Sequence, residues 1–328
     1  MARRTAAAAA LALLVLGACA DPSSPETSMA PGLPLLNRAP DGFPELTTAR
    51  TNKVEPAGVD RGRYNITFRY LGSTDPKYQA VFDEARERWE RIIVKDEPSV
   101  TGTLPTQLCG ARAPAFTGTV DDVLIDVILT QIDGPGRVLG SAGPCFANDN
   151  NLSLHGTMRF DVADIDVFLN RGLLDEIIVH EMGHVLGVGT LWNFRRALRS
   201  PAPDFRFLGD MANVGYNSVG GDGLVPIEDM FGAGTRGSHW RESTFDNELM
   251  TGFIEVNNVN ILSRVTAGSM RDLGYGSAMT AENYKLPVPV TTTAAGAASG
   301  ASVSEDDIDI ASGETFFELQ AVVAPAAP

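Results

Sequence analysis

The pattern of apolar and polar positions predicts a folded region between residues 61 and 277, in which strands and helices are interspersed. Residues 64–70 alternate in polarity and are rich in β-branched and aromatic side chains, which favours a strand. Apolar positions then recur at helical spacing from residue 76 to residue 94, and Pro76 can occupy the first helical position. The apolar run of residues 123–129 predicts a well-buried strand.

Three further elements follow before residue 190. Residues 157–161 form a short strand candidate, and Asp164 could cap a helical turn over residues 165–170. Residues 173–188 have helical apolar spacing, with Gly187 at the position where a helix would stop. The order strand, long helix, strands, second helix predicts an α/β layer with a small mixed sheet, and we class the fold as α+β.

The first 19 residues are predicted to direct export. Arg3 and Arg4 precede an unbroken small or aliphatic run over residues 6–16, which is the plan of a secretory signal. The run ends in Leu-Gly-Ala-Cys and resembles a bacterial lipoprotein cleavage site, in which Cys19 would carry the lipid. A plain secretory signal with an incidental cysteine is the alternative. We expect an extracytoplasmic protein anchored to a bacterial membrane through Cys19, with the outer membrane or cell surface favoured.

Both ends of the predicted folded region border segments of different composition. Residues 20–60 are rich in proline and sustain no helical or strand period, which favours an extended tether. Residues 278–328 include a low-complexity stretch and an acidic run, which predict a mobile tail. Within this tail, residues 315–319 could add one strand.

The net charge argues against a nucleic-acid-binding protein, and the length of the apolar runs argues against an integral membrane protein. The 328 residues contain 26 Lys and Arg against 41 Asp and Glu, a net charge of −15. Such a surface repels phosphate backbones, so we expect no nucleic-acid partner. No run reaches the roughly 18 to 20 apolar residues that a membrane-spanning helix needs. We expect a monomer.

The three cysteines suggest one disulfide. With Cys19 lipidated, Cys109 and Cys145 remain as an even pair in an oxidising compartment. We expect them to be bonded to each other, and two free buried thiols are the alternative.

The helix over residues 173–188 contains the pattern His-Glu-x-x-His. The spacing of four places His180 and His184 on one face, one turn apart, so both imidazoles can reach a single Zn²⁺. Glu181 lies beside the first ligand, where a carboxylate can take a proton from water at the metal. His155 has no partner at ligand spacing, and we expect a loop or surface histidine.

The third ligand is not in the usual metzincin position. In that motif a histidine follows the second ligand by six residues, and here Thr190 stands there. Of the remaining histidines, His239 precedes a tryptophan 55 residues after His184, and Met250 follows 11 residues later in Glu-Leu-Met.

These motifs together resemble the leishmanolysin family of zinc metallopeptidases. The resemblance implies a metzincin-type fold, with the sheet and long helices in an upper lobe and an irregular lower lobe. It implies one Zn²⁺ per chain on His180, His184 and His239, Glu181 as general base, and Met250 in a turn beneath the metal. It also implies a peptide substrate. We expect an extended peptide to lie antiparallel to an edge strand of the sheet, with residues 136–146 as the rim that binds it.

The expected function is therefore that of a lipid-anchored, zinc-dependent endopeptidase that acts on protein or peptide substrates. Two alternatives remain open at this point. One is a catalytically silent cell-surface lipoprotein that binds or adheres through a peptidase fold. The other is a zinc hydrolase that acts on a non-peptide amide.

Overall fold

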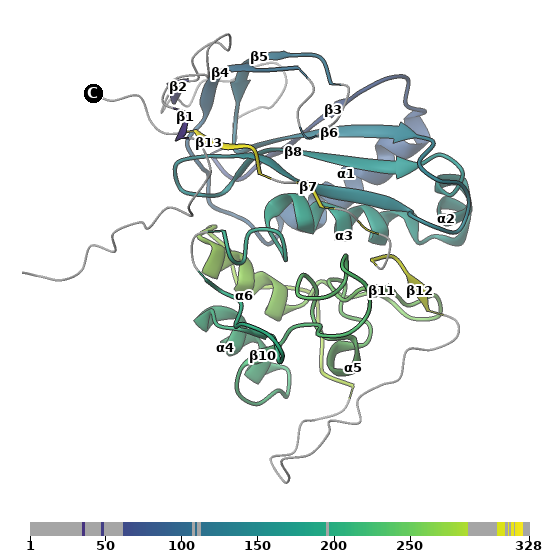
Figure 1. Cartoon of the computed structure of the whole chain (residues 1–328), viewed down its shortest axis with the longest axis vertical. Coiled ribbons are helices and arrows are strands. Elements are labelled where there is room, and N and C mark those ends of the chain that lie inside the picture. The colour runs from purple at the N-terminus through teal and green to yellow at the C-terminus, as the bar shows by residue number, and fades with distance from the viewer. Residues whose placement is uncertain are drawn as a thin grey trace, which may run out of the picture.

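Figure 1 shows the computed structural model of the chain. The structure describes residues 62–106, 109, 113–194, 197–287, 307–311, 314, 316–317 and 319–323, together with two short strands at residues 35–36 and 47–48. The expected signal, the lipidated Cys19 and most of the expected tether lie outside the described residues. Within the described residues, no helix combines the length and apolarity needed to cross a bilayer.

Among the described residues, strands dominate up to residue 161, and five of the six helices follow that point. The helices are α1 (Pro76–Glu90), α2 (Ile165–Arg171), α3 (Leu174–Leu186), α4 (Asp210–Ser218), α5 (Glu242–Phe245) and α6 (Arg264–Leu273). The longer strands are β3 (Ile66–Tyr70), β4 (Val100–Leu104), β5 (Phe116–Val120), β6 (Val123–Thr130), β7 (Gly140–Ala147) and β8 (Ser153–Asp161). The short strands are β1 (Leu35–Leu36), β2 (Thr47–Thr48), β9 (Arg206–Phe207), β10 (Val225–Pro226), β11 (Phe253–Ile254), β12 (Ile308–Asp309) and β13 (Ala321–Val323).

The upper lobe is built on a six-stranded mixed sheet with the order β1-β13-β7-β8-β6-β3. Strands β3, β6 and β8 run parallel, and β7 runs antiparallel to β8. Helices α1 and α3 lie beneath this sheet, and the small sheet β2-β4-β5 lies above it (Figure 1). The structure is thus a mixture of helices and small sheets, consistent with the α+β class.

Strand β6 explains why both faces of the sheet are covered. Val123, Ile125 and Val127 pack into the main core with the helices, whereas Leu124 packs with the cluster under β4 and β5. Alternate residues of a strand point to opposite faces, so a strand that is apolar on both faces requires burial on both. The expected disulfide between Cys109 and Cys145 is present on the β4–β5 side, with its Cα atoms 5.6 Å apart.

Helix α1 begins as expected and ends earlier than expected. The Asp75 side chain accepts a hydrogen bond from the Lys77 N–H at 2.9 Å and caps the helix, which begins at Pro76. The predicted end at residue 94 is wrong, because the helix stops at Glu90. Beyond it the backbone bonds to residues 276–278 instead of continuing the helical ladder, so Ile92 and Ile93 are buried outside the helix.

Helix α3 lies between the sheet and the lower lobe (Figure 1). It ends at Gly187, whose φ of 117° is in the left-handed region that favours glycine. The N–H groups of Gly187 and Val188 donate to the Gly183 carbonyl and close the last turn. The preceding helix α2 is present, but Asp164 does not cap it; the Asp164 side chain accepts from the Gly136 N–H instead.

The lower lobe has little regular structure besides α4, α5 and α6. Helices α4 and α6 approach closely, because a Cβ on Gly215 would lie 2.5 Å from the Arg264 carbonyl oxygen. Four buried aromatic residues form its centre: Trp192, Phe207, Trp240 and Phe245.

The packed chain continues beyond the expected boundary at residue 277. Tyr284 and Leu286 are buried, and Glu282 forms a bidentate ion pair with Arg88 of α1. Further along, the described residues between 307 and 323 lie against both lobes, through β12 on β11 and β13 on β7. The expected mobile tail is therefore wrong for these parts. The described residues of the expected strand over residues 315–319, which are 316, 317 and 319, are not in a strand, and β13 follows at Ala321–Val323.

Candidate metal centre

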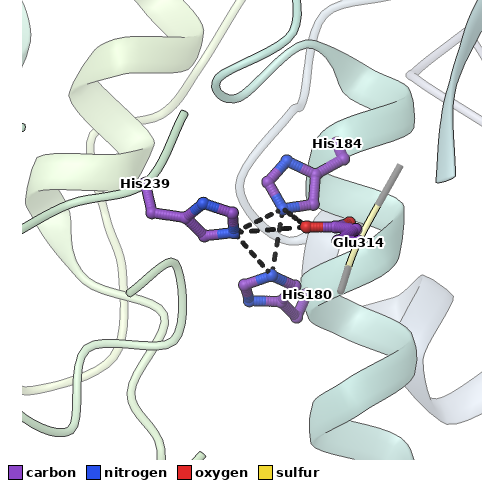
Figure 2. Close-up of side chains that lie close together, drawn as sticks. All are labelled: His180, His184, His239 and Glu314. Carbon is purple, nitrogen blue, oxygen red and sulfur yellow. Dashed lines mark hydrogen bonds and ion pairs between the residues drawn. The ribbon is translucent and has the colours of Figure 1, made fainter. Parts of the chain in front are cut away.

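Three histidines converge between the two lobes. His180 and His184 project from one face of α3, and His239 comes from the lower lobe (Figure 2). All three side chains are fully buried. Their Nε2 atoms form a triangle, with distances of 2.9 Å between His180 and His184, 3.0 Å between His184 and His239, and 3.1 Å between His180 and His239.

The other ring nitrogen of each histidine faces a backbone carbonyl. His180 Nδ1 lies 2.7 Å from the Leu249 oxygen, His184 Nδ1 lies 2.9 Å from the Val188 oxygen, and His239 Nδ1 lies 3.2 Å from the Thr235 oxygen. A carbonyl can only accept, so each Nδ1 carries the proton and donates. Each Nε2 is then an unprotonated acceptor, and the three lone pairs point at one another with no proton between them.

The histidines are also held in the neutral form. Burial lowers the pKa of His180 to about 4, and it lowers the pKa of His184 and His239 well below the ordinary value. The neighbouring rings add to this for His184, and His180 adds to it for His239. Three neutral imidazoles with converging lone pairs are a donor set that suits Zn²⁺.

The spacing fits such an ion. Three nitrogens that bind one Zn²⁺ tetrahedrally at roughly 2.0 to 2.1 Å lie about 3.3 Å from one another. The three Nε2 atoms are within a few tenths of an ångström of that arrangement. His180, His184 and His239 could therefore hold one metal ion, and Glu314 completes the group of possible ligands.

Glu314 was not predicted as a site residue. One carboxylate oxygen, Oε2, lies 3.7 Å from His184 Nε2 and 3.6 Å from His239 Nε2, and the side chain is buried (Figure 2). Among the described residues its carboxyl group has one hydrogen-bonding neighbour, the equally buried carboxyl group of Glu181. The sequence contains one sign that this segment packs, the adjacent pair Phe316 and Phe317, because two neighbouring aromatic side chains are costly to leave in water.

Glu181 lies on α3 beside His180, and its side chain is only 1% exposed. Burial raises its pKa to about 8, and a hydrogen bond with the neighbouring Glu314 carboxyl group opposes this shift. Gly140 of β7 makes room for it, since a Cβ at that position would lie 2.7 Å from Glu181 Oε1. The strand thus fixes the carboxylate beside the histidines, and only glycine permits this approach.

The turn that contains Met250 connects the ligands. The Leu249 carbonyl accepts from His180, and the Met250 carbonyl accepts from the backbone N–H of Trp240 at 2.9 Å, next to His239. Met250 is fully buried, and its Sδ lies 2.7 Å from the position that a Cβ on Gly183 would take. One turn therefore orients two of the histidines and packs against the helix that carries the others.

Glu248 holds this turn in place from within the lower lobe. Its carboxylate accepts from the Met250 N–H at 2.7 Å and from the hydroxyls of Ser263 and Thr266, both at 2.6 Å. Burial raises the pKa of Glu248, but the four donors around it satisfy the charged form. This buried acid is a structural part of the turn.

A cavity of about 510 Å³ lies beside the histidines. Its lining includes Gly189 and Leu191 after α3, Ser238 next to His239, and Arg199 from the lower lobe. Phe316 and Phe317 from the C-terminal part of the chain form part of its wall.

His155 is not the loop or surface histidine that we expected. It lies in β8, fully buried, with its Nε2 3.2 Å from Asp126 Oδ2. Arg69 binds the same carboxylate through two nitrogens, at 2.5 and 2.7 Å. Burial opposes the charge on Asp126, but His155 and Arg69 outweigh it and hold its pKa below the ordinary value. Its neighbours in the sheet therefore make burial of His155 favourable.

The structure brings His180, Glu181, His184, His239 and Met250 together, and it places the Cys109–Cys145 disulfide elsewhere, under β4 and β5. Comparison with models of known protein families and with curated proteins finds no significant match to this chain.

Proposed function

We propose that this protein is a zinc-dependent endopeptidase of the leishmanolysin-like, metzincin type. The observation that carries the proposal is the convergence of three Nε2 lone pairs, each fixed by a carbonyl at Nδ1, beside the buried carboxylate of Glu181. Zinc bound there would supply Lewis acidity, which polarises a scissile carbonyl and acidifies water.

Glu181 would move the proton. As a carboxylate it accepts a proton from the attacking water, and it then donates that proton to the leaving amine. Its rigid seat against Gly140 keeps the carboxylate within reach of a water molecule near the histidines. The carbonyls of Leu249, Val188 and Thr235 would keep each imidazole in the tautomer that binds metal.

The proposal also includes the expected location, lipid anchor and fold type. The disulfide supports an extracytoplasmic location, because disulfides persist in oxidising compartments. Anchoring through a lipidated Cys19 would then hold the catalytic domain at a bacterial membrane. The turn that contains Met250, below the histidines, and the small amount of regular secondary structure in the lower lobe support the metzincin type.

One observation favours a second candidate function. The Glu314 carboxylate stands beside the histidines, where it would compete with water or substrate. A catalytically silent lipoprotein that binds or adheres through a peptidase fold would tolerate such an occupant permanently. Glu181 favours the peptidase, because three histidines can hold zinc without it.

Cleavage of a broad peptide library tests the proposal. We expect Glu181→Gln to lower the cleavage rate by about 10²–10⁴-fold, because it removes the general base. We expect zinc content to stay at one per chain. Both measurements are made in the wild-type background and in Glu314→Ala, so that blockage by Glu314 cannot hide activity. Glu84→Gln, on the exposed face of α1, is the matched control.

The outcomes separate the candidates. Cleavage that depends on Glu181 supports the peptidase. Full zinc occupancy with no cleavage in either background would overturn it in favour of the silent lipoprotein. Absence of zinc from all variants would show that the ligand assignment is wrong.

A further inference from the structure

The C-terminal segment crosses from one lobe to the other in front of the histidines. We call its described residues between Asp307 and Val323 the strap. It starts on the lower lobe, where β12 pairs antiparallel with β11 and the Ile310 N–H donates to the Gly252 carbonyl at 3.1 Å. It ends on the upper lobe, where β13 pairs with β7 (yellow strands in Figure 1).

Glu314 occupies the middle of this path. The residue is 5% exposed, and its carboxylate Oε2 lies 3.6 to 3.7 Å from two of the Nε2 atoms. Its one hydrogen-bonding neighbour among the described residues is the Glu181 carboxyl group, which brings no positive charge. A buried carboxylate is costly unless a positive charge compensates it. Three neutral histidines provide none, but a metal ion held between them would. Glu314 is therefore placed to bind the ion that the histidines bind.

Two aromatic residues attach the strap, Phe316 to the histidines and Phe317 to β7. The Phe316 ring centre lies 4.9 Å from that of His184 and 6.2 Å from that of His239. The Phe317 backbone lies directly over Gly143 of β7, since a Cβ there would be 3.0 Å from its nitrogen and 3.2 Å from its oxygen. The Arg159 guanidinium stacks on the Phe317 ring, 5.1 Å from its centre.

The strap also uses the backbone groups that a substrate would need. The Gln320 N–H donates to the Cys145 carbonyl at 2.8 Å, and β13 continues parallel to β7 at Phe146 and Ala147. Strand β7 lies in the rim expected to bind peptide, and a substrate there is expected to run antiparallel. Strap and substrate therefore compete for one edge, and the strap lies on it in the opposite direction.

We propose that the strap is a built-in plug, in which Glu314 is the fourth metal ligand and residues 316–317 and 319–323 cover the substrate edge of β7. The proposal rests on the proposed function, since it names the regulation of that same metal centre. The chain as described is latent, and access to the centre requires displacement of its own C-terminal segment.

The test measures ligand access to the metal in the full chain loaded with Co²⁺. Acetohydroxamate is the probe, and its binding is followed by the cobalt absorption bands. We expect Glu314→Ala and the closer isostere Glu314→Gln to change the bands of the free protein and to bind acetohydroxamate at least about tenfold more tightly than wild type. Peptide cleavage should rise by a similar factor.

Gln320→Ala is the matched control, because its side chain is exposed on the same strap. Unchanged bands and unchanged acetohydroxamate affinity in both Glu314 variants would overturn the plug, as would an equal effect of Gln320→Ala. Glu314→Gln preserves the shape of the side chain, so it still reports if Glu314→Ala does not fold.

The probe also separates this proposal from the proposed function, since it needs no turnover. If the Glu314 variants bind acetohydroxamate more tightly and no variant cleaves peptide, the plug stands and the peptidase fails. If wild type and variants cleave equally and bind the probe equally, the peptidase stands and the plug is overturned.

Discussion

The two carboxylates of the metal centre are held in very different ways. Glu181 projects from the middle of α3, where the helical ladder fixes the backbone and both the sheet and the lower lobe cover the helix. Glu314 belongs to the strap, which is attached by the two-residue strand β12 and the three-residue strand β13. Removing Glu181 from the centre requires unfolding of the core, whereas removing Glu314 requires that a few ladder bonds open and that Phe316 and Phe317 leave their contacts. The same centre thus contains one permanent acid and one displaceable acid.

The largest contrast should appear in metal binding. We expect His184→Ala to weaken zinc binding by at least about 10³-fold, because it removes one of three ligands fixed by the fold. Glu314→Ala should retain one zinc per chain. Zinc content after dialysis against a chelator such as EDTA checks both. If Glu314→Ala lost its zinc as readily as His184→Ala, the strap would be a permanent part of the site.

The next contrast compares two glycines of β7. A Cβ on Gly140 would strike the Glu181 carboxylate at 2.7 Å, whereas a Cβ on Gly143 would strike the strap backbone at 3.0 Å. We therefore expect Gly140→Ala to lower the cleavage rate by about 10- to 100-fold with zinc retained, since it displaces the base. Gly143→Ala should instead raise the affinity for acetohydroxamate. If Gly143→Ala lowered the cleavage rate as Gly140→Ala does and left the affinity for acetohydroxamate unchanged, the distinction between a fixed Glu181 and a displaceable Glu314 would be contradicted.

The next prediction concerns the stability of α3, the helix that carries Glu181. We expect Gly183→Ala to destabilise the protein by about 1–3 kcal/mol, because the added methyl group overpacks the contact with Met250 Sδ and with Trp89. Thermal unfolding checks this value, and Glu84→Gln again serves as the control. A Tm equal to that of wild type would show that the Met250 side chain moves aside freely.

The smallest expected effect is a pH dependence at the root of the strap. Burial, opposed by Thr251, raises the pKa of Glu242 to about 8, and burial with the Asp307 carboxyl raises that of Glu255 to about 7. Oxygens of Glu242, Glu255 and Asp307 lie within 4.8 Å of one another, and Asp246 adds negative charge nearby.

The sign follows from the folded pKa being above the ordinary value. Glu242 contributes most stability below about pH 4.5, where it is protonated in both states, and the contribution is lost as pH rises towards 8. We expect Tm to fall by a few degrees over this range, and less in Glu242→Gln. A steeper fall in that variant would contradict the assignment.

The sequence pattern alone predicted those parts of the site that lie within one helix. The helical spacing of residues 173–188 and Gly187 predicted α3, and the spacing of four placed His180 and His184 on one face. The apolar run over residues 123–129 predicted the burial of β6 but not which strands lie beside it. His155 was misjudged because its burial depends on Asp126 and Arg69, which the parallel register of three strands brings together.

The parts that sequence did not predict depend on contacts between distant segments. Gly140 carries no local sign that Glu181 will approach it, because that contact depends on how β7 crosses α3. Glu314 lies in a stretch whose average composition favours a mobile tail, and averaging hides the two phenylalanines that attach it. Helix α1 stopped early for a similar reason, since its last residues bond to the chain near Gly276.

The irregularity of β7 has a consequence for the protein once the strap is displaced. Without the strap, β7 becomes the outermost strand of the sheet, and exposed edges invite pairing with other copies of a chain and then aggregation. The register of β7 against β8 shifts between Pro144 and Phe146 and again at Ala147, which makes the strand irregular. An uncovered β7 therefore offers an irregular edge, which suits a single extended peptide better than a growing stack of sheets.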